Sequence, residues 1–252
     1  MKKLLTILLV SLLPSFAMAA GGSAYELDHY PGDISDTASL QRGAQTYMNF
    51  CMGCHSLEYG RYNRVARDLD IPEDIFQEHL MFTDAKIGEL MTNSMDTESA
   101  KEWFGAAPPD LTLVARVRGT DWLYTYLRNF YVDASRPMGV NNRVFPNVGM
   151  PHVMAELQGL CGSIPLPESK EVVDKQSGKL IVASGCQEFY ETGSQTPEEY
   201  DQTVEDLVNF LDYMGEPIQQ TRKTIGFYVI AFLLVFLVFA ILLNREYWKE
   251  LH

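Results

Sequence analysis

Cys51-Met52-Gly53-Cys54-His55 is the stretch of sequence that most constrains the fold. The pattern C-x-x-C-H is typical of a c-type haem attachment site, where two thiols bond the vinyl groups on one edge of the porphyrin. We expect Cys51 and Cys54 to form these thioethers and His55 to be the proximal axial ligand of the iron. The motif therefore predicts one covalently bound haem c.

Three other interpretations of the motif compete with haem attachment: a redox dithiol, half of a zinc site, and two cysteines beside an unrelated histidine. A thioredoxin-like dithiol lies in a βαβ unit, whereas the residues before Cys51 have helical periodicity. Zinc needs a second local pair of ligands, but Cys161 and Cys186 lie more than a hundred residues away. The sequence therefore favours haem.

The N-terminus has the features of a secretory signal. Lys2 and Lys3 precede an apolar run that ends at Ala17-Met18-Ala19, which matches the A-x-A cleavage pattern. We therefore expect residues 1–19 to be a signal peptide and the following domain to lie outside the bacterial cytoplasm.

The C-terminal part contains a candidate membrane span. No charged residue occurs between Lys223 and Arg245, and residues 225–243 form a nearly unbroken apolar run. A helix over this run rises about 28 Å, close to the thickness of about 30 Å of a hydrocarbon core. Basic residues balance on the two flanks, so the signal decides the orientation: we expect residues 222–252 to be a transmembrane anchor with a short cytoplasmic tail.

Residues 20–221 remain as one exported domain, long enough to bury a hydrophobic core. This domain has 14 basic and 31 acidic residues, a net charge of −17, which excludes nucleic acid as a partner. Such an excess indicates a solvated acidic face or a surface that steers a basic protein toward the haem edge. The two interpretations are compatible.

Helical patterns dominate the exported domain and predict a mainly α fold. Asp36 is expected to cap a helix that delivers Cys51 at its C-terminal end. Thr196-Pro197-Glu198-Glu199 has the sequence of a capping box before an apolar stripe that ends near Gly215. Helical segments are also expected at 73–80, 85–91, 113–118 and 121–130. Asp110 is the expected cap of the segment 113–118. The segment 121–130 is rich in aromatic residues, which we expect to pack in the core or against the porphyrin.

Two cysteines remain outside the motif. In an oxidising compartment Cys161 and Cys186 are expected to form a disulfide, and two free thiols are the alternative. The segment between them contains Pro165, Pro167 and Gly178, which favours an excursion such as a hairpin over a second core.

The residues themselves leave the distal ligand of the iron open. A Met ligand is typical of a high-potential electron carrier, a second His lowers the potential, and a vacant position permits ligand chemistry. Met150 is the strongest candidate because it lies in the Gly- and Pro-flanked segment 145–151. Met138 is the next candidate from composition, followed by His152 and Met154.

The order of these parts resembles the cytochrome c1 family, the haem-bearing subunits of the quinol:cytochrome c reductase (cytochrome bc1) complex. The fold that this resemblance implies is a class I cytochrome c-like haem domain with insertions, plus one C-terminal transmembrane helix. The resemblance rests on the signal, Leu40-Gln41-Arg42-Gly43, the haem motif with Ser56 after it, Pro108-Pro109-Asp110-Leu111, Arg116 and Arg118, the segment 145–151, the helix end at 208–217, and the C-terminal anchor.

The resemblance also implies roles for single residues. It makes Met150 the distal ligand, places Arg118 near a haem propionate, and packs Pro109 on the ring. Two departures concern the docking surface: Asn142-Arg143-Val144 stands where the family usually has Tyr-Asn before Phe-Pro, and the Pro-rich sequence after the ligand is reduced to Pro151.

The function that the resemblance implies is a one-electron relay, so the chain is not an enzyme on its own. The donor is the mobile Rieske iron–sulfur protein beside the cytochrome b subunit, and the acceptor is a soluble or anchored periplasmic cytochrome c. The resemblance places the complex, as a dimer, in the bacterial inner membrane, with the haem domain periplasmic and the C-terminus cytoplasmic. Two alternatives share the haem: a membrane-anchored c-type subunit of another oxidase or reductase, and a haem-based sensor.

Overall fold

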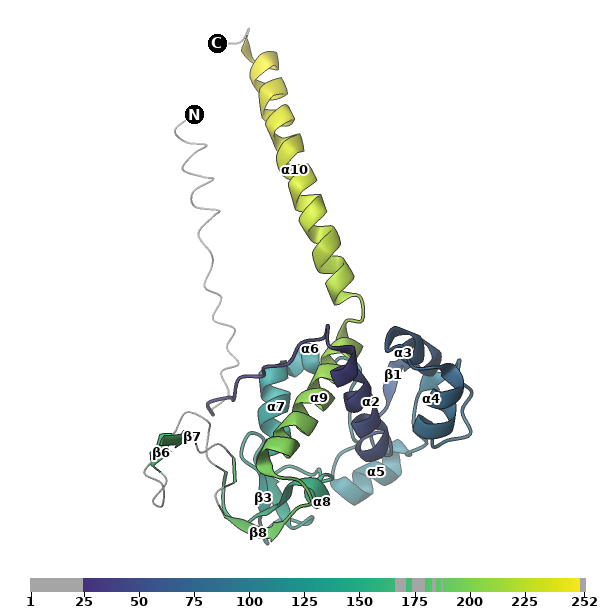
Figure 1. Ribbon diagram of the computed structural model, residues 1–252, viewed down its shortest axis with the longest axis vertical. Coiled ribbons are helices and arrows are strands. Elements are labelled where there is room, and N and C mark those ends of the chain that lie inside the picture. Colours follow the sequence, from purple (N-terminus) through teal and green to yellow (C-terminus); the bar gives the residue numbers. More distant parts are fainter. Residues whose placement is uncertain (1–24, 166–170, 174–179, 183–184, 187, 250–252) are drawn as a thin grey trace.

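The computed structural model describes residues 25–165, 171–173, 180–182, 185–186 and 188–249. A helical domain carries one long helix, α10, which projects from it (Figure 1). The predicted signal peptide, residues 1–19, lies outside the described residues.

Helices form most of the regular structure of the described residues, which confirms the predicted mainly α fold. The helices are α2 (Thr37–Phe50), α3 (Tyr62–Asp68), α4 (Glu73–Leu80), α5 (Thr97–Phe104), α6 (Val114–Arg118), α7 (Thr120–Arg128), α8 (Ala155–Gln158), α9 (Pro197–Gly215) and α10 (Gln219–Tyr247). The strands are β1 (Leu57–Arg61), β2 (Leu90–Met91), β3 (Phe130–Val132), β4 (Val140–Asn142), β5 (Gly159–Cys161), β6 (Glu171–Val173), β7 (Leu180–Val182) and β8 (Phe189–Thr192).

Two of the three predicted helix caps are present, those of α2 and α9. The Asp36 carboxylate accepts hydrogen bonds from the backbone N–H groups of Ala38 (3.0 Å) and Ser39 (3.1 Å) at the start of α2. At the start of α9, the Thr196 hydroxyl accepts from the Glu199 N–H (3.3 Å), and the Glu199 carboxylate accepts from the Thr196 N–H (2.9 Å). These reciprocal bonds satisfy donors that a helix start otherwise leaves unpaired.

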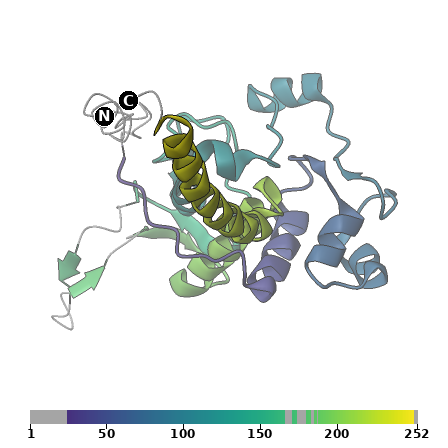
Figure 2. The same cartoon turned by 90° about the horizontal axis from the view of Figure 1, so that it is seen from above.

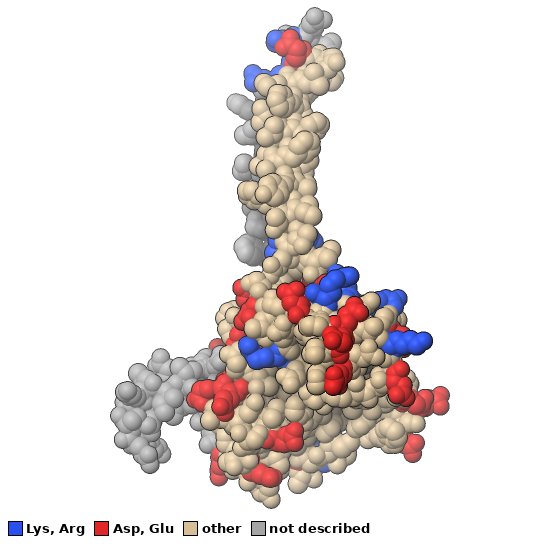
Figure 3. Space-filling model, turned by 45° about the vertical axis from the view of Figure 1, so that its right-hand side comes forward, with Lys and Arg blue, Asp and Glu red and all other residues tan. Residues whose placement is uncertain are grey.

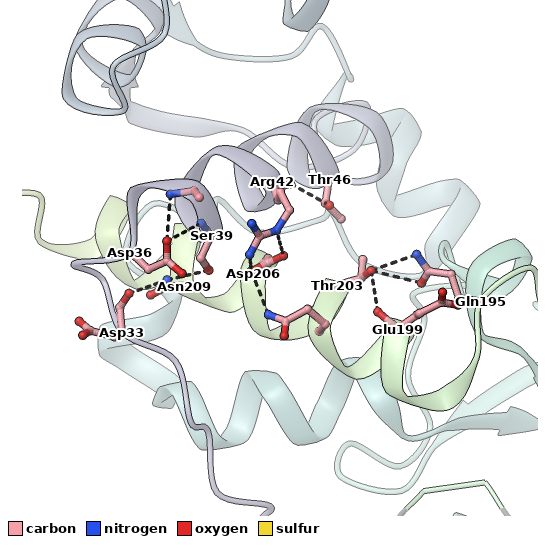
Figure 4. A network of polar contacts seen from close by, with 12 residues as sticks. Asp33, Asp36, Ser39, Arg42, Thr46, Gln195, Glu199, Thr203, Asp206 and Asn209 are labelled. Carbon is pink, nitrogen blue, oxygen red and sulfur yellow. Dashed lines mark hydrogen bonds and ion pairs between the residues drawn. The ribbon is translucent and has the colours of Figure 1, made fainter.

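Helices α2 and α9 pack against each other and form the centre of the domain. Gly43 permits this close approach, because a Cβ at this position would lie 2.0 Å from the backbone oxygen of Asp206. Beside it, the Arg42 guanidinium donates two hydrogen bonds to the Asp206 carboxylate, at 2.6 and 2.9 Å (Figure 4). The Asn209 amide donates to the Ser39 hydroxyl at 2.9 Å, so polar bonds fix the register of the two helices.

We expect Gly43→Ala to destabilise the protein by about 1–3 kcal/mol, because the added methyl group forces α2 and α9 apart. Chemical denaturation of the detergent-solubilised protein measures this free energy of unfolding. Gly88→Ala is the matched control, since a Cβ at Gly88 meets no atom of the described residues within 4 Å. Equal stabilities of the two variants would contradict the role given to Gly43.

Two local predictions were wrong, and both failed because backbone groups found tertiary partners. Residues 85–91 do not form a helix: β2 pairs antiparallel with β1, and the Ile87 carbonyl accepts from the Asn63 N–H at 2.7 Å. Asp110 does not cap α6, whose N-terminal flanking residue is Leu113. Its carboxylate instead accepts from the N–H groups of Glu58 (2.7 Å) and Thr112 (2.9 Å).

The strands form short antiparallel pairs beside the helices. β3 pairs with β4, and β5 pairs with β8. Cys161, at the end of β5, forms a disulfide with Cys186, which confirms the predicted pairing. Between the two cysteines, β6 and β7 form the expected hairpin, which projects from the domain (Figure 2).

Helix α10 has the length and composition of a membrane span. Within its 29 residues, a stretch of 18 residues has a mean hydropathy of 3.0, and no part of that stretch is buried against the rest of the described chain. The helix rises about 44 Å, more than the hydrocarbon thickness of about 30 Å. It includes the whole predicted span, residues 225–243, and its exposed apolar surface suits a lipid environment.

Candidate haem site

A cavity of about 360 Å³ opens where the end of α2 meets α6, α7 and α9. Its walls are mainly apolar, with leucine, proline and aromatic side chains, which suits a flat apolar macrocycle. All six residues that the sequence assigned to the haem contribute to its walls: Cys51, Cys54, His55, Pro109, Arg118 and Met150.

The imidazole of His55 is oriented by a carbonyl group. Its Nδ1 lies 2.7 Å from the backbone oxygen of Pro109, and a carbonyl oxygen can only accept a hydrogen bond. Nδ1 therefore carries the proton, and Nε2 keeps the lone pair that an iron ligand needs. Burial lowers the pKa of His55, opposed by the bond to Pro109, so the neutral form is favoured.

The backbone of the haem motif continues from α2. Cys51 ends the helix, and the N–H groups of Cys54 (3.0 Å) and His55 (2.9 Å) both donate to its carbonyl oxygen. The hydroxyl of Tyr47, one turn earlier, donates to the carbonyl oxygen of His55 at 2.6 Å. These bonds hold the two thiols and the imidazole on one compact turn.

The environment of the thiols disfavours the redox dithiol. Burial, together with the neighbouring Cys54, raises the pKa of the Cys51 thiol to about 12, whereas a redox-active thiol has a lowered pKa. The zinc interpretation also loses its additional ligands, because Cys161 and Cys186 are bonded to each other.

Met150 reaches the cavity on a segment that several polar bonds hold in place. The buried Asn142 donates to the Tyr126 carbonyl oxygen on α7 (2.8 Å) and accepts from the N–H groups of Val144 (2.9 Å) and Phe145 (3.2 Å). At Gly149 the segment passes so close to the Phe104 carbonyl oxygen that a Cβ would lie 2.5 Å from it. Contacts with α7 and with the end of α5 therefore set the position of Met150.

The other sulfur and imidazole candidates do not reach this cavity. Met138 packs against the core, and His152 and Met154 are buried, but none of the three lines the cavity walls. His152 stacks on the ring of Phe130 with a centroid distance of 4.9 Å. The geometry therefore favours Met150 among the candidates that the sequence left open.

Aromatic side chains of α7 form another wall. The rings of Trp122 and Tyr126 are stacked, 4.8 Å apart, and both line the cavity, whereas Tyr124 and Phe130 belong to the core behind them. The exposed Arg118 lies over Trp122, with its guanidinium carbon 5.1 Å from the ring centroid. It supplies a positive charge at the rim, which suits a propionate.

Sequence reasoning missed some residues of the site. The hydroxyl of Tyr126 donates to the sulfur of Met150 at 3.3 Å, and Phe104, Leu207 and Leu211 also line the cavity. The aromatic pattern of α7 predicted that Tyr126 packs in the core or against the porphyrin, but it held no signal for a contact across 24 positions. The apolar cavity therefore brings together two thiols on one turn, an imidazole whose Nε2 keeps its lone pair, and a thioether. This set of groups fits a haem c.

Comparison with known proteins supports this interpretation. The sequence model described as the Cytochrome C1 family matches residues 29–251. Cytochrome c1 of Allochromatium vinosum is 47% identical over 252 residues, covering the whole of both chains. The chain belongs to the cytochrome c1 family. Cytochrome c1 of Blastochloris viridis is 27% identical over 270 aligned positions, which cover 92% of this chain and 89% of that protein.

A third relative has a different name. A protein of Nitrosomonas europaea called ammonia monooxygenase gamma subunit is 40% identical over 252 residues and also covers the whole of both chains. This name does not alter the assignment, because the family match and the relatives from Allochromatium and Blastochloris agree on cytochrome c1.

Family membership confirms the coarse functional predictions. As a member of this family, the chain is an electron-transfer subunit of a cytochrome bc1 complex and not an enzyme by itself. The family implies a covalently bound haem c and a complex that also contains cytochrome b and a Rieske protein. Helix α10 agrees with a membrane-anchored subunit.

Proposed function

We propose that this chain relays single electrons from the Rieske iron–sulfur protein to a periplasmic cytochrome c through one haem. In this proposal Cys51 and Cys54 would hold the haem covalently, and His55 and Met150 would bind its iron. When bound, the haem supplies an iron that takes up and gives up one electron. The chain's own residues hold this iron in an apolar cavity and tune its potential through a His/Met pair.

The observation that carries the ligand assignment is the shared cavity. His55 and Met150 are separated by almost a hundred residues, yet both line the same walls as the two thiols. Pro109 supports His55 through its carbonyl oxygen, and Arg118 provides a cation at the rim for a propionate. These contacts make Pro109 and Arg118 supporting residues of the proposed site.

Charged side chains are unevenly distributed over the face of the domain that Figure 3 shows. In this view Lys and Arg side chains lie mainly in the part of the domain nearest α10, with some Asp and Glu among them, and the part farther from α10 carries mostly Asp and Glu. Near the start of α10, Glu216 pairs with both Arg116 (3.7 Å) and Arg222. An acidic surface away from the membrane favours a basic, soluble or anchored, cytochrome c as the acceptor.

The same proposal includes an orientation. Residues 1–19 would be a removed signal, residues 20–221 the periplasmic haem domain, and residues 222–252 the anchor with a cytoplasmic tail in the bacterial inner membrane. An exported N-terminus with one span supports this order. We also propose that the complex is a dimer, as the family resemblance implies.

Purification in mild detergent tests the function. We expect one covalent haem per chain, the spectrum of a low-spin haem with His and Met ligands, and copurification with a cytochrome b and an iron–sulfur subunit. Rapid mixing with the reduced Rieske protein and an oxidised basic cytochrome c should then show electron transfer that slows as ionic strength rises. Isolation as a free monomer with full activity would contradict the proposal. So would copurification with a different oxidase or reductase, or carbon monoxide binding to the reduced native protein.

A further inference from the structure

A buried phenol contacts the sulfur atom that the proposed function assigns to the iron. The hydroxyl oxygen of Tyr126 lies 3.3 Å from Sδ of Met150, within the range of a hydrogen bond to sulfur. Only 8% of Tyr126 is exposed, so bulk water does not compete for this hydroxyl. A phenol hydroxyl carries a proton that it can donate to a sulfur acceptor.

Ring packing and backbone bonds leave the phenol little freedom. One face of Tyr126 stacks on Trp122 with an interplanar angle of 9°, and its edge meets Phe130, with a centroid distance of 5.2 Å. The Asn142 amide donates to the Tyr126 carbonyl oxygen at 2.8 Å, and the same side chain holds the segment that leads to Met150. The donor and the sulfur are therefore fixed with respect to each other.

The chemistry of a thioether permits both interactions at once. Its sulfur has two lone pairs, so it can bond a metal with one and accept a weak hydrogen bond with the other. A hydrogen bond withdraws electron density from the sulfur and makes it a weaker donor to iron. Ferric iron needs donated density more than ferrous iron does, so the bond favours the reduced state and raises the midpoint potential.

We propose that Tyr126 is a positioning residue for the distal ligand, whose hydroxyl orients the sulfur of Met150 and raises the midpoint potential of the haem. The proposal rests on the proposed function, because it takes Met150 as the distal ligand. It assigns Tyr126 a role beyond packing, although its neighbours on α7 belong to the hydrophobic core.

Redox titration of the full-length holoprotein with Tyr126→Phe tests this role. Phenylalanine keeps both ring contacts and removes only the hydroxyl, so we expect normal haem content and a lowered midpoint potential. Tyr213→Phe is the matched control: its buried hydroxyl donates to the Asp68 carboxylate at 2.9 Å, and Tyr213 does not line the cavity. We expect this control to leave the potential unchanged. An unchanged potential in Tyr126→Phe would overturn the proposal.

A double-mutant cycle shows whether the effect passes through sulfur. In Met150→His, a coordinated imidazole nitrogen has no lone pair left to accept from the phenol. Adding Tyr126→Phe to this variant should therefore leave the potential of the bis-histidine haem unchanged. An equal downward shift in both backgrounds would mean that Tyr126 acts on its surroundings in general, and would overturn the proposal.

The optical spectrum of Met150→Leu separates this inference from the ligand assignment. If Met150→Leu keeps a low-spin His/Met spectrum, the proposed ligand is wrong and the role of Tyr126 fails with it. If Met150→Leu loses that spectrum but Tyr126→Phe keeps the wild-type potential, the ligand assignment stands and only the role of Tyr126 is overturned.

Discussion

Replacing Met150 by leucine is expected to abolish the low-spin His/Met spectrum while the haem stays covalently attached. Leucine fills similar space but has no donor atom, so the iron loses its distal ligand, whereas Cys51 and Cys54 still hold the porphyrin. We expect the midpoint potential to fall by a few tenths of a volt, within the range of about 0.8 V over which axial ligands set haem potentials.

Three measurements check this outcome on the detergent-solubilised protein. Haem staining after denaturing electrophoresis reports covalent attachment, the optical spectrum reports the ligands, and redox titration gives the potential. The reduced variant should also bind carbon monoxide, because a coordination position has become vacant.

Met138→Leu is the matched control for this prediction. Met138 packs against the core but does not line the cavity, so its replacement should keep the wild-type spectrum and potential. If Met138→Leu destroyed the spectrum and Met150→Leu preserved it, the ligand assignment would be reversed.

The haem motif and the starts of α2 and α9 could be predicted from sequence because their signals are local. The C-x-x-C-H spacing places three functional groups on one turn, and Asp36 and Thr196 start helices with bonds to residues two or three positions ahead. A capping residue acts within one helical turn, so a short window of sequence contains the whole interaction. The same holds for the apolar run of residues 225–243.

The parts that could not be predicted depend on partners far along the chain. Residues 85–91 have helical periodicity, but β1 and the start of α3 offered their backbone groups better partners. The contact between Tyr126 and Met150 needs the particular course of the segment after β4, which Asn142 fixes by bonding to α7. No periodic pattern encodes such a contact, because both residues lie outside each other's local window.

Arg128→Met is expected to lower the free energy of unfolding by about 3–5 kcal/mol, the cost of breaking a buried ion pair from one side. Only 3% of Arg128 is exposed, and its guanidinium donates to Asp201 (2.6 and 2.9 Å) and to Asp28 (3.2 Å). The guanidinium also lies over Tyr124, 4.3 Å from the ring centroid. Methionine would remove the guanidinium that donates to the buried carboxylate of Asp28, so the segment before α2 should detach from α7 and α9 first.

Chemical denaturation measures this loss, and two further variants establish its cause. Arg64→Met removes an exposed pair with Asp68 in the same helix and should cost no more than about 0.5 kcal/mol. Adding Asp28→Asn to Arg128→Met should restore part of the stability, because the buried negative charge that the guanidinium balanced disappears with it. If Arg128→Met cost no more than Arg64→Met, the desolvation of the guanidinium would already offset its ion pairs, and packing alone would hold the N-terminal segment on the haem domain.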